Sequence, residues 1–197
     1  MTLIERLDAA RERWNVLEHP FYKRWSCGEL SRDELAYYAG EYRHAVVALA
    51  DTAAKSGSTE HAREEAEHVF LWDEFAAAFD ANTTREPSPT TEECVVAWTA
   101  PGDRQEALAV LYAIEAGQPA VSQAKLDGLA EHYGVGADEP GAAYFALHTT
   151  LDHEHAAESR QALEAEADVT DGDRLVEAAE RALRGNWTLL NGVDARR

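Results

Sequence analysis

The sequence has few cysteines, few lysines and no long apolar run, and each scarcity excludes a class of protein. Only two cysteines, Cys27 and Cys94, occur among the 197 residues, and no CxxC motif joins them. Neither a disulfide framework nor a thiolate zinc site is therefore expected. No apolar segment approaches the ~20 residues of a membrane span, and the N-terminus lacks the apolar stretch of a signal peptide. We therefore expect a cytoplasmic protein with no membrane partner.

The charge is strongly one-sided. There are 37 acidic residues against 18 basic ones, for a formal net charge of −19, and only three of the basic residues are lysines. Such a surface repels nucleic acid and anionic membranes, so neither is expected as a partner. A carboxylate-rich, lysine-poor surface suits a high-salt cytoplasm, where screening weakens self-repulsion. A halophilic source and an ordinary acidic cytosolic protein explain the composition equally well.

The chain has the pattern of helices throughout. Alanine, glutamate, leucine and arginine dominate, apolar residues recur at spacings of three and four, and no stretch alternates like a strand. We expect an all-α fold in which residues 1–197 form one domain, a bundle of about seven helices with inward-facing ligands. The main expected helices are residues 31–54, 59–79, 103–134 with a kink at Pro119, and one that begins near Pro140 and continues past His155.

Two helical stretches repeat the order histidine, carboxylate, histidine at positions i, i+4 and i+7. The triplets are His61, Glu65 and His68, and then His148, Asp152 and His155. On an α-helix these positions form one column on one face. A single triplet could equally be a solvated face that happens to hold two histidines. Two columns facing each other would hold one or two divalent metals, and imidazole with carboxylate suits iron, manganese or zinc.

Two further carboxylates belong to this interpretation. Glu115 ends the most apolar run of the chain, so its side chain should be buried. Buried carboxylates need a metal, a cationic partner or several donors, and we favour a metal over an arginine partner. Glu41 forms an ExxH motif with His44 at the border of an apolar face. It either orients a ligand, contacts substrate or is a plain surface group.

Several segments also resemble a known superfamily. They are the stretches 19–25, 28–30, 68–72, 112–119 and 144–155, and they resemble the haem-oxygenase-like helical proteins. That superfamily includes the TenA thiaminases, the PqqC quinone-forming oxidase and non-haem diiron oxidases. The resemblance implies a haem-oxygenase-like bundle, a homodimer, and a ligand set that contains Glu115 and the triplet of His148, Asp152 and His155.

Within the superfamily, the sequence most resembles the CADD-type proteins, which make 4-aminobenzoate for folate. That resemblance implies Tyr22 as an internal precursor and Lys125 as the source of an amine. The diiron proteins carry a glutamate where this chain has His61. Glu64 or Glu65 could supply that carboxylate from the same helix, and we cannot choose between them from spacing.

These observations predict a non-haem dinuclear iron, or iron–manganese, oxygenase or oxidase that uses O₂. In it Glu115 would bridge or cap the two metals, and each triplet would hold one of them. The substrate is a small molecule or a side chain of the protein itself, and 4-aminobenzoate synthesis is one candidate. Two alternatives are a metal-binding or ligand-binding module without redox chemistry, and a TenA-like hydrolase. The hydrolase is disfavoured because no cysteine lies near Glu115.

Overall fold

The computed structural model describes residues 1–166 and 172–196, and this part of the chain contains helices and turns but no strand. This confirms the all-α prediction. None of the described helices is both long and apolar enough to cross a bilayer. The α-helices are α1 (Leu3–Arg13), α2 (Pro20–Ser26), α3 (Arg32–Lys55), α4 (Thr59–Ala78), α5 (Pro89–Thr99), α6 (Arg104–Glu115), α7 (Gln118–Gly128), α8 (Ala143–His148), α9 (Leu151–Glu166) and α10 (Gly172–Asp194).

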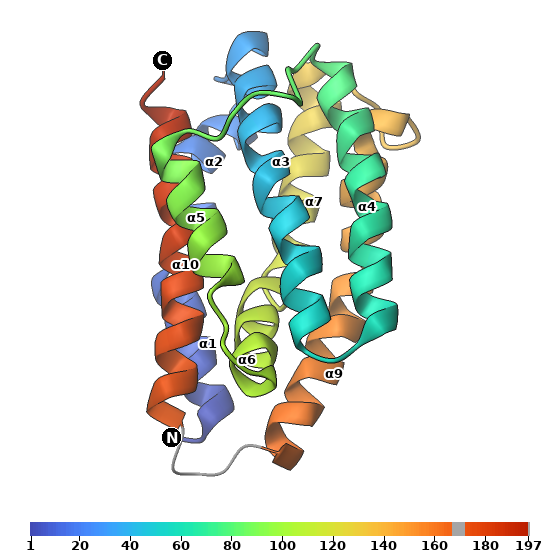
Figure 1. The fold of residues 1–197 in the computed structure, drawn as a ribbon. Coiled ribbons are helices and arrows are strands. Elements are labelled where there is room, and N and C mark those ends of the chain that lie inside the picture. Colours follow the sequence, from blue (N-terminus) through green and yellow to red (C-terminus); the bar gives the residue numbers. More distant parts are fainter. Residues whose placement is uncertain (167–171, 197) are drawn as a thin grey trace.

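The helices form an elongated bundle (Figure 1). The antiparallel pair α3 and α4 has the most extensive contact in the bundle, and α5 packs against α3 and α10. On the other side, α6 packs against α9 and α10, and α1 packs against α10. Three short elements complete the chain: the 3₁₀ turns Val16–Glu18 and Pro140–Ala142, and the π-helical turn Leu129–Tyr133.

Several helix starts follow from local chemistry. Ser31 and Glu34 form the expected capping box at the start of α3, in which each side chain binds the backbone N–H of the other. Ser58 caps α4, and Asp103 caps α6. These caps satisfy backbone donors that a helix leaves unpaired in its first turn.

Two of the expected helices are divided. Instead of one helix over 103–134, α6 ends at Glu115 and α7 begins at Gln118. Pro119 is the cause, because its ring would clash with the carbonyl group four residues earlier and it has no N–H to donate. The second His–carboxylate–His column is also divided, since α8 ends at His148 and α9 begins at Leu151.

Local hydrogen bonds explain the second break. The hydroxyl of Thr149 donates to the carbonyl of Ala146, and that of Thr150 donates to the carbonyl of Leu147. Such side-chain bonds compete with the helical ladder. The expectation that one continuous helix carries the second column was therefore wrong, although its three side chains still point to one place.

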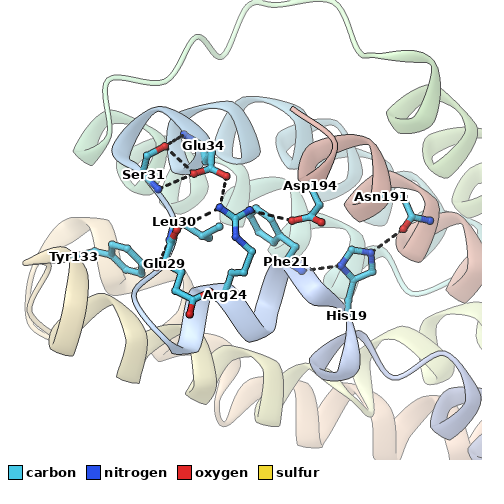
Figure 2. Close-up of polar contacts among 10 residues, drawn as sticks. All are labelled: His19, Phe21, Arg24, Glu29, Leu30, Ser31, Glu34, Tyr133, Asn191 and Asp194. Atoms are coloured by element: carbon cyan, nitrogen blue, oxygen red, sulfur yellow. Dashed lines mark hydrogen bonds and ion pairs between the residues drawn. The ribbon is translucent and has the colours of Figure 1, made fainter. Parts of the chain in front are cut away.

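A polar network fixes α2 against two other helices (Figure 2). The guanidinium group of Arg24 donates to Asp194 of α10 at 3.0 Å, to Glu34 of α3 at 2.5 Å, and to the carbonyl of Glu29 at 3.3 Å. Near the start of α2, His19 accepts from the N–H of Phe21 and contacts Asn191 of α10 at 3.1 Å. These bonds tie α2, which carries Tyr22, to α3 and α10.

The centre of the bundle is dominated by aromatic side chains. Trp25, Trp72, Tyr38, Tyr144 and Phe145 are all less than 3% exposed. Helix α7 approaches this core closely, because a Cβ added at Gly128 would lie 2.5 Å from the ring of Trp25. The indole N–H of Trp25 also donates to the carbonyl of Lys125 at 3.2 Å, so α2 and α7 are tied together at this point.

Candidate metal centre

All seven predicted metal ligands converge on one interior site. Helix α4 supplies three of them, α6 supplies its last residue, α8 supplies its last residue, and α9 supplies two. The helix breaks have a consequence here. Because α6 ends at Glu115 and α8 ends at His148, each of these side chains enters the site from the C-terminus of its helix. Every one of the seven side chains is buried: His61, Glu65, His68, Glu115, His148, Asp152 and His155.

The imidazoles and carboxylates lie within contact distance of one another. His61 Nε2 is 3.0 Å from Glu115 Oε1, and His68 Nδ1 is 3.3 Å from Glu65 Oε1. Glu65 Oε1 also lies 3.7 Å from His155 Nδ1 and 3.8 Å from His61 Nε2. Glu65 is thus the carboxylate with the most imidazole neighbours, and it lies at the centre of the cluster.

Three sets of ligand atoms in this cluster are close enough to hold an ion, with all atoms of a set within 4.8 Å of one another. Each set mixes residues of the two columns, so the geometry favours ions shared between the columns, and the assignment of one metal to each triplet stays a prediction. Glu65 belongs to two of the sets, so its carboxylate is placed to contribute to two ions if both were bound, and the bridging or capping role of Glu115 stays a prediction. The sets are His61, Glu115 and His155; Glu65, His68 and His148; and Glu65, Asp152 and His155.

The cluster has a hydrogen-bonding deficit that a metal would remove. Nine buried nitrogen and oxygen atoms of these seven residues have no hydrogen-bond partner among the described residues. Leaving buried polar groups unpaired costs free energy, and nine such atoms in one cluster therefore indicate a bound partner. Four imidazoles and three carboxylates are the donor set that iron, manganese and zinc accept. The residues present therefore fit a site for such ions.

The pKa values of the cluster are shifted in opposite directions. Burial raises the pKa of Asp152 to about 9, and the negative charges of Glu115 and Glu65 add to this shift. Burial lowers the pKa of His148 to about 4. Although burial favours its neutral form, the pKa of Glu65 is held below its usual value by His68 and the other imidazoles. Groups with such divergent shifts in one buried site are typical of functional centres.

Neighbouring groups orient two of the imidazoles. His148 Nδ1 lies 2.6 Å from the carbonyl of Tyr144, so it donates there and its Nε2 faces the cluster. His155 Nε2 lies 3.2 Å from Glu64 Oε2, so its Nδ1 is directed inward. Partners of this kind fix the tautomer and direction of metal-binding histidines. They place Glu64 at the rim of the cluster and Glu65 inside it, a choice that spacing alone left open.

Glu41 has a different environment from the one expected. It is completely buried, but its carboxylate accepts from the N–H of Ser88 at 3.0 Å and from the hydroxyl of Thr91, and it pairs with Arg85 at 2.9 Å. These partners lie in or next to the 80–88 segment before α5. Glu41 therefore fastens that segment to α3, which corrects its interpretation as a group that orients a metal ligand.

The structure brings Tyr22 and Lys125 together in a second buried place. The ammonium group of Lys125 lies 5.0 Å from the centre of the Tyr22 ring, and the Tyr22 hydroxyl bonds that of Tyr38 at 2.9 Å. Within the described part of the chain, no hydrogen bond or ion pair to the Lys125 ammonium group is found. It is instead surrounded at 5.0–5.8 Å by the rings of Tyr22, Tyr38, Tyr42, Trp72 and Phe145. We call this the lysine chamber.

The ring of Tyr144 connects the lysine chamber to the metal cluster. The ring of Tyr144 stacks on His148 with centres 4.0 Å apart, and it lies 5.0 Å from the ring of Trp72, which is a wall of the chamber. Tyr144 is i−4 from His148 and so shares its helix face, but sequence spacing gave no sign that its ring would connect two sites.

Comparison with known proteins also supports a metal centre. A sequence family of haem-oxygenase-like proteins, described as iron-containing redox enzymes, matches residues 30–187. The chain belongs to this family. Membership confirms the prediction of a redox enzyme and supports iron as the metal.

Relatives and solved structures agree with the family. A 4-aminobenzoate synthase of Chlamydia muridarum is 28% identical over 97% of this chain and 89% of its own length. One from Nitrosomonas europaea is 28% identical over 98% of this chain and 91% of its own. A haem-oxygenase-like domain from Shewanella denitrificans has a TM-score of 0.76 at 18% identity, covering 99% of this chain and 93% of that one. A CADD-like protein from Nostoc punctiforme has a TM-score of 0.62 at 15% identity, covering 96% and 97%.

A TenA homologue from P. horikoshii has the same fold, with a TM-score of 0.77 at 15% identity over 98% of each chain. At this identity the likeness concerns the fold alone.

The two cysteines of this chain are Cys27, which is exposed, and Cys94, which is buried in α5. Neither is among the residues that form the metal cluster or the lysine chamber.

The buried amine of this family member should make its stability depend on pH. Burial lowers the pKa of Lys125 from its usual 10.5 to about 7. Between these two values the unfolded chain binds a proton that the folded chain does not, so the free energy of unfolding rises with pH across this window. Lys125→Met should therefore stabilise the protein at pH 6–7, by on the order of 4 kcal/mol, and the gain should vanish above about pH 10.

Urea unfolding at pH 6, 8 and 10 measures this effect. Lys55→Met is the matched control, because Lys55 is exposed and its loss should leave the pH dependence unchanged. A Lys125→Met variant that keeps the pH dependence of the wild type would show that the amine is solvated or paired in solution.

Proposed function

We propose that this protein is a non-haem dinuclear iron, or iron–manganese, oxygenase that makes 4-aminobenzoate from its own Tyr22, with Lys125 as the source of the amine. The observation that carries the proposal is the pairing of two buried sites. One is a cluster of seven ligand residues with nine unpaired polar atoms, and the other is an amine held 5.0 Å from a tyrosine ring. The names of the two relatives support the product.

The chemistry of the residues fits this product. A tyrosine side chain contains a para-substituted ring with one carbon opposite its oxygen, which is the carbon skeleton of 4-aminobenzoate. The conversion would break the Cα–Cβ bond of Tyr22 and oxidise Cβ to a carboxylate. It would also replace the ring oxygen, released as water, by the nitrogen of Lys125, whose Cε–Nζ bond breaks. Two bound metal ions would supply electrons for the reduction of O₂, which is the oxidant.

The side chains of this chain would prepare the reactants. The lysine chamber keeps a fraction of Lys125 neutral near pH 7, and only the neutral amine has a lone pair for attack. The bond between the hydroxyls of Tyr22 and Tyr38 holds the ring in place, and the surrounding rings exclude water. Glu64 and the carbonyl of Tyr144 keep His155 and His148 directed into the cluster, where the two metals would bind. No external organic substrate is needed in this scheme. The homodimer, which the resemblance implies, stays a prediction.

Metal loading followed by exposure to air tests the proposal. Metal-free protein is loaded with Fe(II), or with Fe(II) and Mn(II), under anaerobic conditions and then mixed with O₂. We expect about two metal ions per chain, O₂ consumption, 4-aminobenzoate in the filtrate, and changes of mass confined to the peptides that contain Tyr22 and Lys125. Tightly held zinc with no O₂ consumption would instead favour a metal-binding module. Product formation without a change at Tyr22 would show that the substrate is a separate small molecule.

A further inference from the structure

A pocket of about 240 Å³ opens beside the metal cluster, between the first turns of α4 and the N-terminal half of α9. Figure 1 shows the beginning of α4 next to α9. The pocket walls include two cluster histidines, His61 and His155. Both side chains are more than nine-tenths buried. His61 Nε2 and His155 Nδ1 lie near the carboxylates Glu115 and Glu65, but within residues 1–166 and 172–196 neither atom makes a hydrogen bond of acceptable geometry. The bottom of this pocket is therefore the metal cluster itself.

Ser58, Leu151 and four glutamates line the rest of the pocket, and we call the four glutamates the acidic mouth: Glu60, Glu64, Glu154 and Glu158. Among the residues that the structure describes, no lysine or arginine lines the pocket. The nearest guanidinium group found, that of Arg63, is 3.9 Å from Glu64 but 2.5 Å from Glu67, which is therefore its main partner. The acidic mouth has an excess of negative charge that the neighbouring side chains do not neutralise.

Helix stability does not explain these glutamates. Acidic residues in the first turn of a helix interact favourably with its dipole, which accounts for Glu60 and Glu154. The effect fades beyond that turn, where Glu64 and Glu158 lie. The residues also form two pairs of like charge at i, i+4, one on each helix, and such pairs destabilise a helix by a few tenths of a kcal/mol. An arrangement that weakens both helices points to a ligand of opposite charge.

We propose that the acidic mouth is an entry site that captures divalent transition-metal cations, such as Fe(II) and Mn(II), and passes them to the cluster. Carboxylates around a concave opening concentrate cations there and speed their association. Oxygen ligands exchange readily with the water shell of such ions, and imidazoles deeper in the pocket bind them more strongly. Glu64 is the link between the two, because its Oε2 lies 3.2 Å from His155 Nε2. The inference rests on the proposed metal centre and adds its route of loading.

The rate of metal uptake tests the entry site. The variant Glu60→Gln/Glu154→Gln/Glu158→Gln leaves the seven cluster residues and Glu64 unchanged. Co(II) is mixed with metal-free protein in a stopped-flow instrument, and its ligand-field absorption reports arrival at the cluster. We expect the second-order rate constant to fall about tenfold at low ionic strength, while the final number of ions per chain stays the same. The wild-type rate should fall with added salt, and the rate of the variant should depend on salt much less.

A second triple variant controls for the net charge of the protein. Glu92→Gln/Glu93→Gln/Glu131→Gln removes three exposed carboxylates from outside the pocket and should load at the wild-type rate. Equal slowing of both triple variants, or no slowing of either, would overturn the entry site. A lower final stoichiometry in the first variant would also overturn it, because those glutamates would then be ligands. A wild type that binds no metal would instead refute the proposed function.

Discussion

Glu65→Gln is expected to abolish dinuclear metal loading, although it changes one atom. Glu65 belongs to two of the three sets that could hold an ion, and its oxygen lies within 3.8 Å of three imidazoles. An amide keeps the shape of the side chain but removes the negative charge that would attract divalent ions to both sets. We expect the amount of bound Fe(II) or Co(II) to fall from about two ions per chain to one or none, with affinity for any remaining ion reduced by at least about 100-fold.

The measurement is metal content after gel filtration, together with circular dichroism to show that helix content is near wild type. Glu67→Gln is the matched control, because Glu67 lies on the same helix but is exposed and paired with Arg63. His148→Ala and Glu115→Ala should lose dinuclear loading as well. Retention of two ions per chain by Glu65→Gln would contradict its central place in the site.

Lys125→Ala is expected to stop 4-aminobenzoate production without affecting metal loading. The Lys125 amine lies among five aromatic rings and does not contact the cluster, so its removal should leave the metal ligands in place. We expect iron content near wild type, product at background, and no rescue of a strain that depends on added 4-aminobenzoate for folate. Lys55→Ala is the control, since Lys55 is exposed.

Tyr22→Phe gives an independent test of the same chamber. Loss of the Tyr22 hydroxyl should also abolish the product, whereas Tyr38→Phe removes the same hydrogen bond from the other side and should only reduce it. Normal rescue by Lys125→Ala would eliminate the self-modifying scheme. A Tyr38→Phe variant as inactive as Tyr22→Phe would show that the hydrogen bond, and not the identity of the consumed ring, controls the reaction.

The sequence predicted a helical fold, and it predicted the seven cluster residues because their chemistry conflicts with their surroundings. Glu115 follows a long apolar run, so a carboxylate there had to be buried. The two triplets repeat at a spacing that aligns side chains on one helix face. The expected burial of Glu115 and the spacing of the triplets both follow from local periodicity, which does not depend on tertiary contacts.

Other features were outside the reach of spacing. Glu64 and Glu65 are adjacent on α4 and both border the same face, so only the position of α9 decides which one points inward and which one holds His155. The spacing of Glu41 is also that of a group that orients a ligand. Its partners Arg85 and Ser88 are more than 40 residues away in the chain, so spacing could not indicate them. The breaks after Glu115 and His148 depend on Pro119 and on two threonines whose effect on a helix varies with context.

The amino-acid order alone determined that this chain is helical and that His61, Glu65 and His68 lie in one column, because both properties depend on neighbours within about two turns. The tertiary structure decided which atoms share an ion, that Lys125 faces Tyr22, and that four glutamates surround one opening. Those contacts join residues from helices far apart in the chain, and their geometry is set by how the helices pack.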